Sequence, residues 1–523
     1  MSVEDSWRPA HNPWVIALTV TLATFMEVLD TSIANVSLPH IAGNLSAGVD
    51  ESTWVLTSYL VANAIILPLS AWLSSLIGRK RYYMISVAVF TFSSLLSGLA
   101  PSLRWLVVFR IMQGLGGGGL QPSEQSILAD TFPQEKLGMA MAVYGFAVVT
   151  APIIGPTLGG WITDNFSWRW IFFINIPVGF ISLALTSHFV SDPPHMERRS
   201  LKNLKIDYIG LGAVALGLAA LQIVLDKGQR EDWFASHWVT VLTAVAVFAL
   251  IFLVFWELNH EDPIIRMSML KERNFLLANV LMFVLGVTMF SSTVLLPLFL
   301  QTLMGYTATM AGLVLSPGGL ITMATMPLVG VLLSKFQPRW LIMWGLMVVG
   351  SSLVMMSHFN LNVDYTTAVT TRLIQASGLG FLFVPINTAA YGFVKPRDRT
   401  QASGFINLSR NMGGGVGIAI ATTILARSSQ KYQAVLSAHM TLLNPAYGAA
   451  LAHTTQALVA HGVSPLQASG FAPGFIYQEL LRQASMLSYL TDFRFMAGLC
   501  FGSLLLACLL KKIQPSKGPA VVH

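Results

Sequence analysis

Six charged side chains interrupt stretches of sequence that are otherwise long and apolar. If these stretches cross a lipid bilayer, each charge costs at least a few kcal/mol, which proteins tolerate mainly where the charge has a task. Each residue is therefore a functional candidate, and the alternative in every case is a buried ion pair that only supports packing. The six are the acids Glu27, Asp30 and Glu124 and the bases Arg110, Arg372 and Arg410.

Glu27 and Asp30 are three residues apart, so a helix places both carboxyl groups on one face. Two neighbouring carboxylates cannot both stay charged cheaply where the dielectric constant is low. One of them is therefore expected to take up and release a proton near neutral pH. Binding of a proton or of a substrate cation is the predicted role of Asp30 and, on a weaker basis, of Glu27.

Arg110 is the predicted partner of Asp30. Arg110 stands about six residues, and Asp30 about eight, from the same end of the bilayer, so their depths agree within about 3 Å. Protonation of Asp30 would release Arg110, and this two-state contact could bias a gate. A static pair that only fixes helix packing is the alternative.

Glu124 follows Arg110 by fourteen residues, which on a helix leaves the two on nearly the same face and about 21 Å apart in depth. It is a candidate proton relay or cation attractor, and the alternative is a solvated acid at a helix end. Arg372 has no acid in its own stretch, so for Arg372 and Arg410 a substrate anion or an acid elsewhere in the fold is the expected partner. The residues assigned to substrate binding are Asn35, Gln113, Arg372, Asn387 and Arg410.

The composition requires a membrane setting for these residues. The 523-residue chain is 54% hydrophobic and only 11% charged, whereas a soluble protein carries about 25% charged residues. Soluble, secreted and disordered classes are therefore excluded.

The net charge of +7 is interpreted as membrane topology rather than nucleic-acid binding. The two cysteines, Cys500 and Cys508, share the last apolar stretch, so no disulfide framework, metal site or cofactor is expected, and no cleavable signal peptide is recognised.

Fourteen apolar stretches are long enough to cross a bilayer as helices. Lys and Arg are about three times more frequent in the connections on the side of the N terminus, which places both termini in the cytoplasm. The predicted fold is thus an all-α polytopic membrane protein with fourteen transmembrane helices. The stretches are 14–38, 52–76, 82–100, 104–129, 137–163, 168–190, 206–225, 237–256, 275–302, 308–333, 339–358, 363–393, 400–426 and 489–510.

The sequence repeats itself at an offset of about 260 residues. Arg110-Ile-Met-Gln113 corresponds to Arg372-Leu-Ile-Gln375, and Pro68-Leu corresponds to Pro327-Leu. Such repeats indicate two pseudo-symmetric six-helix halves with substrate held between them near the bilayer midplane. The predicted domains are an N-terminal half at 1–195, two inserted helices at 196–262, and a C-terminal half at 263–523 with a long periplasmic loop at 427–488.

Several motifs resemble one transporter family. Leu29-Asp30-Thr31 through Pro39, Arg110-x-x-Gln113-Gly114, Ala151-Pro152 through Gly160, Trp168 through Pro177, and Leu221 through Gly228 with Asp232-Trp233-Phe234 occur in order along the chain. They resemble the 14-span drug:proton antiporters of the major facilitator superfamily, and EmrB-like multidrug exporters in particular. The resemblance implies alternating-access export of hydrophobic or amphipathic compounds in exchange for protons, across a bacterial inner membrane. EmrB-like sequences often carry a neutral residue at the position of Glu27.

Two of these motifs imply gating. The antiporter motif contains Pro152, Gly155, Pro156, Gly159 and Gly160, and the stripe of small residues Ala147, Ala151, Gly155 and Gly159 is expected to allow close helix approach across the interface between the halves. The cytoplasmic loop motif keeps Gly78, Arg79 and Lys80 but has Ser75 where the superfamily has an acid that latches the inner gate. The inner gate must therefore be held in another way.

The segment 427–488 is the one long outer loop, and Phe475–Met486 within it is predicted as an amphipathic helix. By the resemblance, it contacts a periplasmic membrane-fusion adaptor (EmrA-like) that joins an outer-membrane channel (TolC-like), or forms an exit portal. A loop that rests on the membrane surface is the alternative.

Other functions compete with drug export. Export of one metabolite, fatty acid or siderophore fits the same motifs, and a sensor that does not transport would tolerate loss of Asp30. An enzyme is not expected, because no histidine lies near the middle of an apolar stretch. The run Gly116–Gly119 lacks the following Lys-Ser/Thr of a phosphate-binding loop, so a nucleotide site is rejected.

Overall fold

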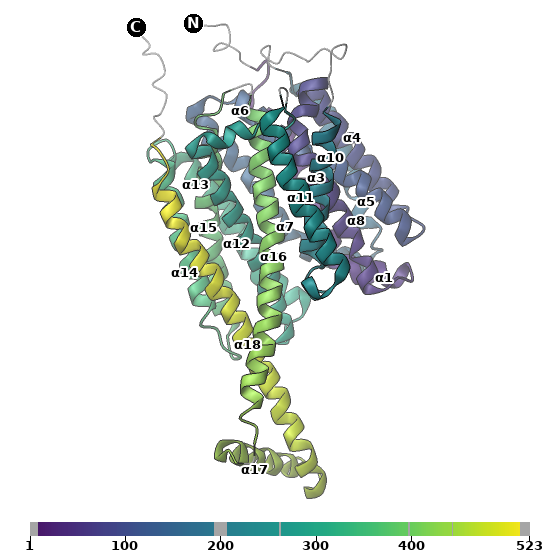
Figure 1. Cartoon of the computed structure of the whole chain (residues 1–523), viewed down its shortest axis with the longest axis vertical. Helices are drawn as coiled ribbons and strands as arrows, with labels where there is room; N and C mark the ends of the chain where they lie inside the picture. The colour runs from purple at the N-terminus through teal and green to yellow at the C-terminus, as the bar shows by residue number, and fades with distance from the viewer. Residues whose placement is uncertain (1–8, 193–206, 261–262, 396–397, 442, 513–523) are drawn as a thin grey trace.

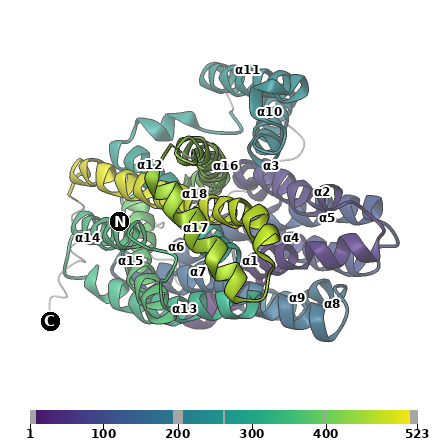
Figure 2. The same cartoon turned by 90° about the horizontal axis from the view of Figure 1, so that it is seen from below.

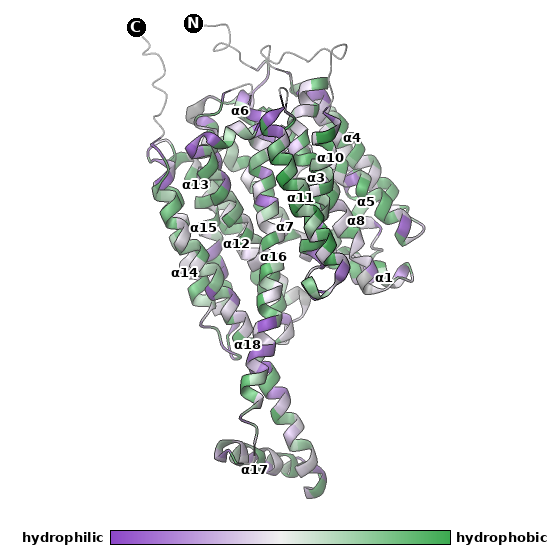
Figure 3. Ribbon diagram, viewed as in Figure 1, coloured by the Kyte–Doolittle hydropathy of each residue, from purple (hydrophilic) through white to green (hydrophobic). Residues whose placement is uncertain are grey.

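The computed structural model describes residues 9–192, 207–260, 263–395, 398–441 and 443–512, and within these ranges the chain is helical, without a β-strand. Ten helices are long and apolar enough to cross a membrane, and the bent pair Lys136–Pro152 and Ile154–Asn165 would make an eleventh. Hydrophobic residues predominate along the helices of the bundle (Figure 3), and many large apolar side chains are exposed, as expected for a surface that faces lipid.

A first group of helices packs mainly on itself. Within it α1 lies against α7 and α9, and α5 lies against α3 and α4. The bounds are α1 Pro13–Asn44, α2 Val49–Ser52, α3 Trp54–Ile77, α4 Arg79–Gly98, α5 Leu103–Gly117, α6 Leu120–Thr131, α7 Gln134–Asn165, α8 Trp170–Phe173 and α9 Asn175–Phe189.

A second group of helices also packs mainly on itself. Within it α12 lies against α16, α14 lies against α15, and α18 lies against α14 and α16. The two groups meet where α7 packs on α13 and α15 and where α16 packs on α3 and α6. The bounds are α12 Arg273–Thr302, α13 Ala308–Leu332, α14 Pro338–Met356, α15 Tyr365–Tyr391, α16 Arg399–Ser437, α17 Pro445–Ala460 and α18 Pro465–Cys508.

Helices α10 (Tyr208–Lys227) and α11 (His237–Asn259) form a hairpin at the edge of the bundle (Figure 2). Of the two, α10 makes the larger contact with the bundle, on α3 and α16. Short 3-10 helices, η3 Trp233–Ala235 and η4 Met267–Lys271, flank α11. The predicted boundary between the first half and the inserted helices, at residues 195 and 196, lies outside the described residues, as does residue 262.

The predicted fourth stretch, 104–129, is broken into two helices, α5 and α6. The break lies at Gly118 and Gly119, because glycine is a poor helix former and allows close approach of neighbouring chain segments. A Cβ atom on Gly118 would lie 2.7 Å from the carbonyl oxygen of Asn63, and one on Gly119 would lie 2.5 Å from the hydroxyl of Tyr82. The break therefore brings α6 close to α3 and α4.

The segment 427–488 is mostly helical, which corrects the prediction of a loop that is helical only at Phe475–Met486. Helix α16 continues to Ser437 and α18 begins at Pro465, so both run far beyond the predicted stretches. In Figure 1, α1 begins and α18 ends at the top of the bundle (the upper end), while this segment projects from the bottom (the stalk end) with α17 across its tip. We call its described residues, 427–441 and 443–488, the stalk.

Side-chain contacts hold the two long helices of the stalk together. The hydroxyls of Tyr432 and Thr491 lie 3.1 Å apart, and the Gln433 amide donates to the Tyr477 hydroxyl at 2.7 Å. The stalk was missed as helix because it lacks a long apolar run, although its alanines, leucines and glutamines favour helix.

Candidate functional site

Asp30 and Arg110 form the predicted pair, deep between α1 and α5. Arg110 Nη1 lies 2.6 Å from Asp30 Oδ2, and both side chains are essentially unexposed. Asp30 Oδ1 accepts hydrogen bonds from the amides of Gln113 at 3.0 Å and Asn175 at 2.7 Å. Arg110 also donates to the carbonyl of Val55 and to Gln113 Oε1. The carboxylate thus has a full set of donors when it is charged, whereas protonation would remove one of its acceptor sites.

Glu27 has its own set of donors, although it shares a helix face with Asp30. Its Oε1 accepts from the hydroxyl of Tyr59 at 2.8 Å and from the amide of Asn63 at 3.1 Å. Its Oε2 accepts from the Gln121 amide at 2.6 Å. Tyr59 joins the two sites, because its ring lies under the guanidinium of Arg110, with 4.3 Å from Cζ to the ring centroid.

The Glu27 site reaches Arg410 in the second group of helices. Arg410 Nη2 donates to Gln121 Oε1, while Arg410 Nη1 donates to the Tyr144 hydroxyl at 3.2 Å. Gln121 therefore connects a carboxylate of α1 to a guanidinium of α16 through one amide. This answers the expectation for Arg410: its hydrogen-bond partner is an amide of the first group, with the acid one step further away.

Glu124 is fully buried, which excludes the alternative of a solvated acid at a helix end. The Thr21 hydroxyl donates to its Oε1 at 2.5 Å, and its Oε2 has no hydrogen-bond partner among the described residues. A buried carboxyl group with one unused oxygen is suited to holding a proton rather than a charge.

The remaining substrate-assigned residues are dispersed. Arg372 is buried and donates to Gln375 Oε1, while its Nε has no partner among the described residues. Asn387 is buried, and its Oδ1 lies 3.4 Å from the amide of Gln125. Asn35 is exposed and takes part in neither acid site. Gln113 belongs to the Asp30 site. The structure thus brings Gln113 and Arg410 to the acids and leaves Asn35, Arg372 and Asn387 apart from them.

The cytoplasmic loop motif forms an ion-pair cluster at the upper end. Arg79, buried at the start of α4, pairs with Asp130 of α6, and Arg399 of α16 lies 2.7 Å from the other oxygen of Asp130. Arg399 also donates to the carbonyl of Ala129 at 2.6 Å. One carboxylate therefore ties together the two groups of helices, and we call Arg79, Asp130 and Arg399 the inner cluster.

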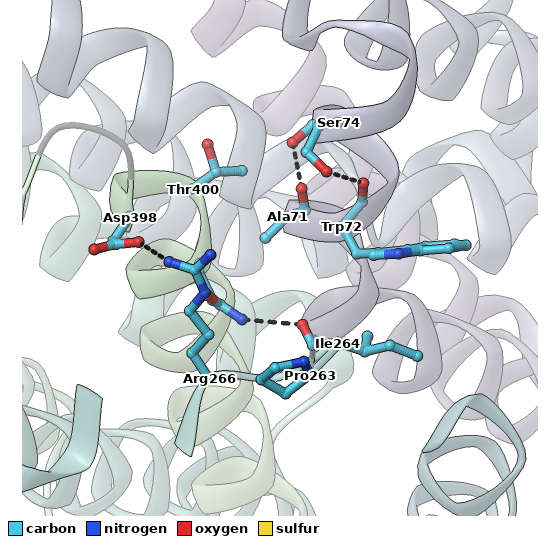
Figure 4. A pocket seen from close by; sticks show the side chains of 10 residues that line it. Ala71, Trp72, Ser74, Pro263, Ile264, Arg266, Asp398 and Thr400 are labelled. Atoms are coloured by element: carbon cyan, nitrogen blue, oxygen red, sulfur yellow. Dashed lines mark hydrogen bonds and ion pairs between the residues drawn. The ribbon is translucent and has the colours of Figure 1, made fainter. Parts of the chain in front are cut away.

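Gly78, Lys80 and Ser75 have supporting positions around this cluster. Gly78 adopts a φ of +90° that glycine alone accepts readily, and the chain turns there from α3 into α4. Lys80 donates to the carbonyl of Ser187 at 2.7 Å. Ser75 lies in the wall of a cavity of about 130 Å³, where Arg266 pairs with Asp398 at 2.7 Å (Figure 4). Asp130 rather than residue 75 supplies the acid at this end.

Gly155 and Gly159 of the antiporter motif pack inside the first group rather than across to the second, which corrects the prediction for these two glycines. A Cβ atom on Gly155 would lie 2.4 Å from Ser32 Oγ, and one on Gly159 would lie 2.9 Å from Ile33 Cγ2, so both glycines let α7 approach α1. The Ser32 hydroxyl donates to the carbonyl of Pro152 at 3.2 Å. Gly160 has open space instead, and Pro156 lies inside α7. Contacts of α7 with the second group include Gly138 and Gly145, outside the motif, and Thr157 within it, which faces Gly312 of α13.

Sequence reasoning missed the polar partners of the acids. Tyr59, Asn63, Gln121, Tyr144 and Asn175 are all buried and all bind the site described above. The available signal was the occurrence of amides inside apolar stretches, where an unpaired amide is costly. A further acid was also missed: Asp492 lies inside the last predicted stretch and is buried.

Comparison with known proteins identifies the family. Residues 20–418 and 324–510 match the model of the Major Facilitator Superfamily. The chain is 35% identical over 496 residues to the multidrug export protein EmrB of Escherichia coli strain K12, with 94% of each chain covered. It is 37% identical over 469 residues to the fatty acid resistance protein FarB of Neisseria gonorrhoeae, with 89% of this chain and 90% of FarB covered.

A solved structure supports the fold. The human organic anion transporter MFSD10 (TETRAN) matches 95% of this chain and 100% of its own with a TM-score of 0.61, at 11% sequence identity. The arrangement of helices is therefore shared even where the sequences have diverged. Because the family match spans most of the chain and the identity to EmrB extends over nearly all of it, the chain belongs to the major facilitator superfamily and, within it, to the family of EmrB-type multidrug export proteins.

Proposed function

We propose that this membrane protein is a proton-coupled antiporter that exports hydrophobic or amphipathic drugs and toxic compounds by alternating access. The observation that carries the proposal is the buried Asp30–Arg110 pair, which is connected through Tyr59, Glu27 and Gln121 to Arg410 in the other group of helices. Proton uptake by one acid can therefore alter contacts between the two groups.

The coupling step follows from the donors around Asp30. When Asp30 is charged, Arg110 is held at 2.6 Å, and the opposite charges compensate each other in a medium of low dielectric constant. When Asp30 takes a proton, that compensation disappears, and Arg110 is free to adopt a second arrangement. Glu27 is the second candidate carrier, and Glu124, with its unused oxygen, is a relay towards the upper end.

Alternating access requires an inner gate, and the inner cluster supports that role. Arg399 belongs to α16, whereas Arg79 and Asp130 belong to α4 and α6, so the cluster must break when the two groups separate at the upper end. Asp130 takes over the latch that the superfamily assigns to the acid at the position of Ser75.

The same proposal includes fourteen transmembrane helices with both termini in the cytoplasm. Besides the ten helices that pass the test of length and apolarity, α4, the α5–α6 pair, α7 and α16 each lie where a stretch was predicted. The two six-helix halves at 1–195 and 263–523, with the inserted helices between them at 196–262, agree with the grouping of packed helices. The upper end is then cytoplasmic.

The stalk would lie in the periplasm in this orientation. We assign it to contact with an EmrA-like membrane-fusion adaptor, which would lead to a TolC-like outer-membrane channel, with the transporter in a bacterial inner membrane. The support is its projection well beyond the bundle (Figure 1) and the exposed apolar side chains of Leu443, Leu466 and Phe471. An exposed apolar surface of this kind commonly marks a contact with a partner or a membrane.

A dedicated exporter of one metabolite, fatty acid or siderophore is the second candidate. The identity to FarB favours a fatty acid within this class, and Arg372 and Arg410 are buried guanidinium groups whose charge suits an anion. Competition between a lipophilic drug and a long-chain fatty acid for the same export activity separates the two candidates.

Proteoliposomes with an imposed pH gradient test the proposal. We expect drug addition to collapse the gradient for the wild type and for the exposed-acid control Asp164→Asn, but not for Asp30→Asn. If Asp30→Asn still couples, Glu27 or Glu124 carries the proton instead. If the wild type shows no proton flux with any lipophilic compound and only a fatty acid drives flux, broad drug export is wrong and the dedicated exporter is the better description.

A further inference from the structure

Asp492 of α18 is a buried acid without hydrogen-bond donors. Its side chain is 0% exposed, and neither carboxyl oxygen has a hydrogen-bond partner among the described residues. By contrast, Asp30 and Glu27 each accept three hydrogen bonds, and Glu124 accepts one. The environment of Asp492 therefore differs from that of the other acids in the bundle.

Aromatic rings pack on either side of this position in α18. Tyr489, one turn before Asp492, packs edge-on against Phe299 with 5.4 Å between ring centroids. Phe493, the next residue, packs against Phe359, which itself stacks on Phe299 at 5.8 Å. The Tyr489 hydroxyl lies 3.3 Å from the Thr302 hydroxyl. Aromatic rings thus flank this position on α18, and the hydroxyl of Tyr489 is engaged with Thr302.

Charged groups on the packed helices do not compensate Asp492. Helix α18 packs on α12, α14, α16 and α17, and none of their basic side chains forms an ion pair with Asp492 among the described residues. Those basic side chains are Arg273 of α12, Arg339 of α14, Arg399, Arg410, Arg427 and Lys431 of α16, and His453 of α17.

Arg273, Arg427, Lys431 and His453 are exposed. Arg339 lies over the ring of Trp340, and Arg399 and Arg410 have the partners given above.

The charged and titratable groups of α18 and the stalk point elsewhere as well. Arg494 is exposed, and Arg482 pairs with Glu479 at 3.2 Å. The Tyr432 hydroxyl of α16 is bonded to Thr491, and the Cys500 thiol lies 3.6 Å from the Thr288 hydroxyl. A charged carboxylate at position 492 would therefore have neither a counter-ion nor a donor.

A carboxylate in these surroundings is expensive, because burial removes water and nothing replaces it. The carboxylic acid form, which carries no charge, removes most of that cost. We propose that Asp492 is a proton-binding site of the second group of helices, occupied by a proton in this conformation, and that the proton exchanges with the stalk end during transport.

The depth of Asp492 supports exchange at that end. Tyr489 contacts Thr302, the last residue of α12, and Asp492 lies three residues further along α18, about 4.5 Å deeper. A small separation of α12 and α18 would therefore bring water to the carboxyl group, while the path to the upper end is much longer.

The inference has two parts: Asp492 holds a proton in this conformation, and that proton exchanges with the stalk end during transport. The second part rests on the proposed antiport, whereas the first part does not. Infrared difference spectroscopy of the full-length protein in liposomes tests the first part directly. We expect a carbonyl band of a protonated carboxylic acid near neutral pH in the wild type and in the exposed-acid control Glu479→Gln. Asp492→Asn should lose part of that band, and Asp492→Glu should shift it. An unchanged band in a folded Asp492→Asn protein, or in Asp492→Glu, overturns the assignment.

The ratio of protons to drug in proteoliposomes tests the second part. We expect Asp492→Asn to keep drug transport and to lower this ratio, whereas Asp30→Asn abolishes coupling. If the infrared band is lost but the ratio stays unchanged, the proton at Asp492 does not cycle and the exchange step is wrong. If the wild type couples no protons at all, the proposed antiport fails, and the infrared result still decides whether Asp492 binds a proton.

Discussion

Arg110 and Arg372 begin the same Arg-x-x-Gln pattern in the two groups of helices, yet they have different surroundings. Both guanidinium groups are buried, and both donate to the glutamine three residues later. Arg110 also binds the carboxylate of Asp30. Arg372 has no ion pair with a carboxylate among the described residues, and its Nε and the amide nitrogen of Gln375 lack partners there.

This difference suggests a division of labour between the two groups. Glu27, Asp30 and Glu124 all belong to α1 and α6 of the first group. Glu27 and Asp30 each accept three hydrogen bonds, whereas Glu124 accepts one, from Thr21. The second group supplies Arg410 as a cation that reaches the first group through Gln121. Three buried acids thus lie in the first group, whereas the second group has a duplicated arginine without a carboxylate partner among the described residues and, in Asp492, a buried acid without hydrogen-bond donors there.

The largest effect is expected for Arg110→Met. It leaves Asp30 as a buried carboxylate without its counter-ion, which typically costs about 3–5 kcal/mol of unfolding free energy. Thermal unfolding in detergent should show the loss, and proton-coupled transport should disappear.

The matched control for this variant is the double variant Arg110→Met with Asp30→Asn. It removes both charges, so much of the stability should return while coupling stays absent. A double variant no more stable than Arg110→Met would contradict a pair held together by charge.

A smaller loss, about 1.5–3 kcal/mol, is expected for Asp130→Asn, because hydrogen bonds to charged groups have this size. The inner cluster joins the two groups, so the variant should also open the upper end. Pulsed electron paramagnetic resonance measures the distance between spin labels at the exposed positions Lys136 and Lys335, in a Cys508→Ser background, and this distance should increase. An unchanged distance distribution would show that other contacts hold the gate.

The inner cluster should be insensitive to pH in the physiological range. Burial raises the pKa of the Asp130 carboxyl group, but the guanidinium groups of Arg79 and Arg399 outweigh it and hold that pKa below its usual value. A lowered pKa contributes stability above the unfolded value of about 3.9, and this stability is lost only as pH falls through the folded value. The Lys136–Lys335 distance in the wild type without drug should therefore stay constant between about pH 5 and pH 8. A change of the distance within that pH range would mean that the inner cluster itself responds to pH.

Tyr59→Phe is expected to cost about 1 kcal/mol, since it removes one of three hydrogen bonds to Glu27 and keeps the ring under Arg110. Drug-driven proton flux should fall, while the Asp30–Arg110 pair persists. Tyr59→Leu removes the ring as well and should lose more stability and more flux. Equal effects of the two variants would mean that the ring does not join the two acid sites.

The smallest effect on stability is expected for Arg372→Met. Replacing a buried charge that has no compensating carboxylate by an apolar side chain of similar length is neutral or stabilising by up to about 1 kcal/mol. Transport of cationic and neutral drugs should persist, and transport of an anion such as a fatty acid should fall. Destabilisation as large as that of Arg110→Met would show that Arg372 has an acid partner in another conformation and that the two groups are more alike.

Much of the fold follows from the sequence by itself. The described residues of every predicted apolar stretch are largely helical, although 104–129 and 168–190 are each divided into two helices, because the need to satisfy backbone hydrogen bonds in lipid leaves few alternatives. The Asp30–Arg110 pair could also be predicted, since two charges at equal depth in an apolar medium have a strong reason to meet. The resemblance of the motifs placed the chain in the correct family.

Other features were decided only by the tertiary structure. The stalk depends on α16 and α18 supporting each other beyond the bundle, through contacts such as Tyr432 with Thr491, which no local pattern encodes. The partners of Glu27 come from α3 and α6, 32 to 94 residues away in the chain. Helix periodicity determines which face a residue occupies, but the neighbour of that face is set by the packing of several helices at once. For this reason Gly155 and Gly159 were expected at the interface between the groups, whereas they pack on α1, and Asp130 was found as the acid of the inner cluster only in the folded chain.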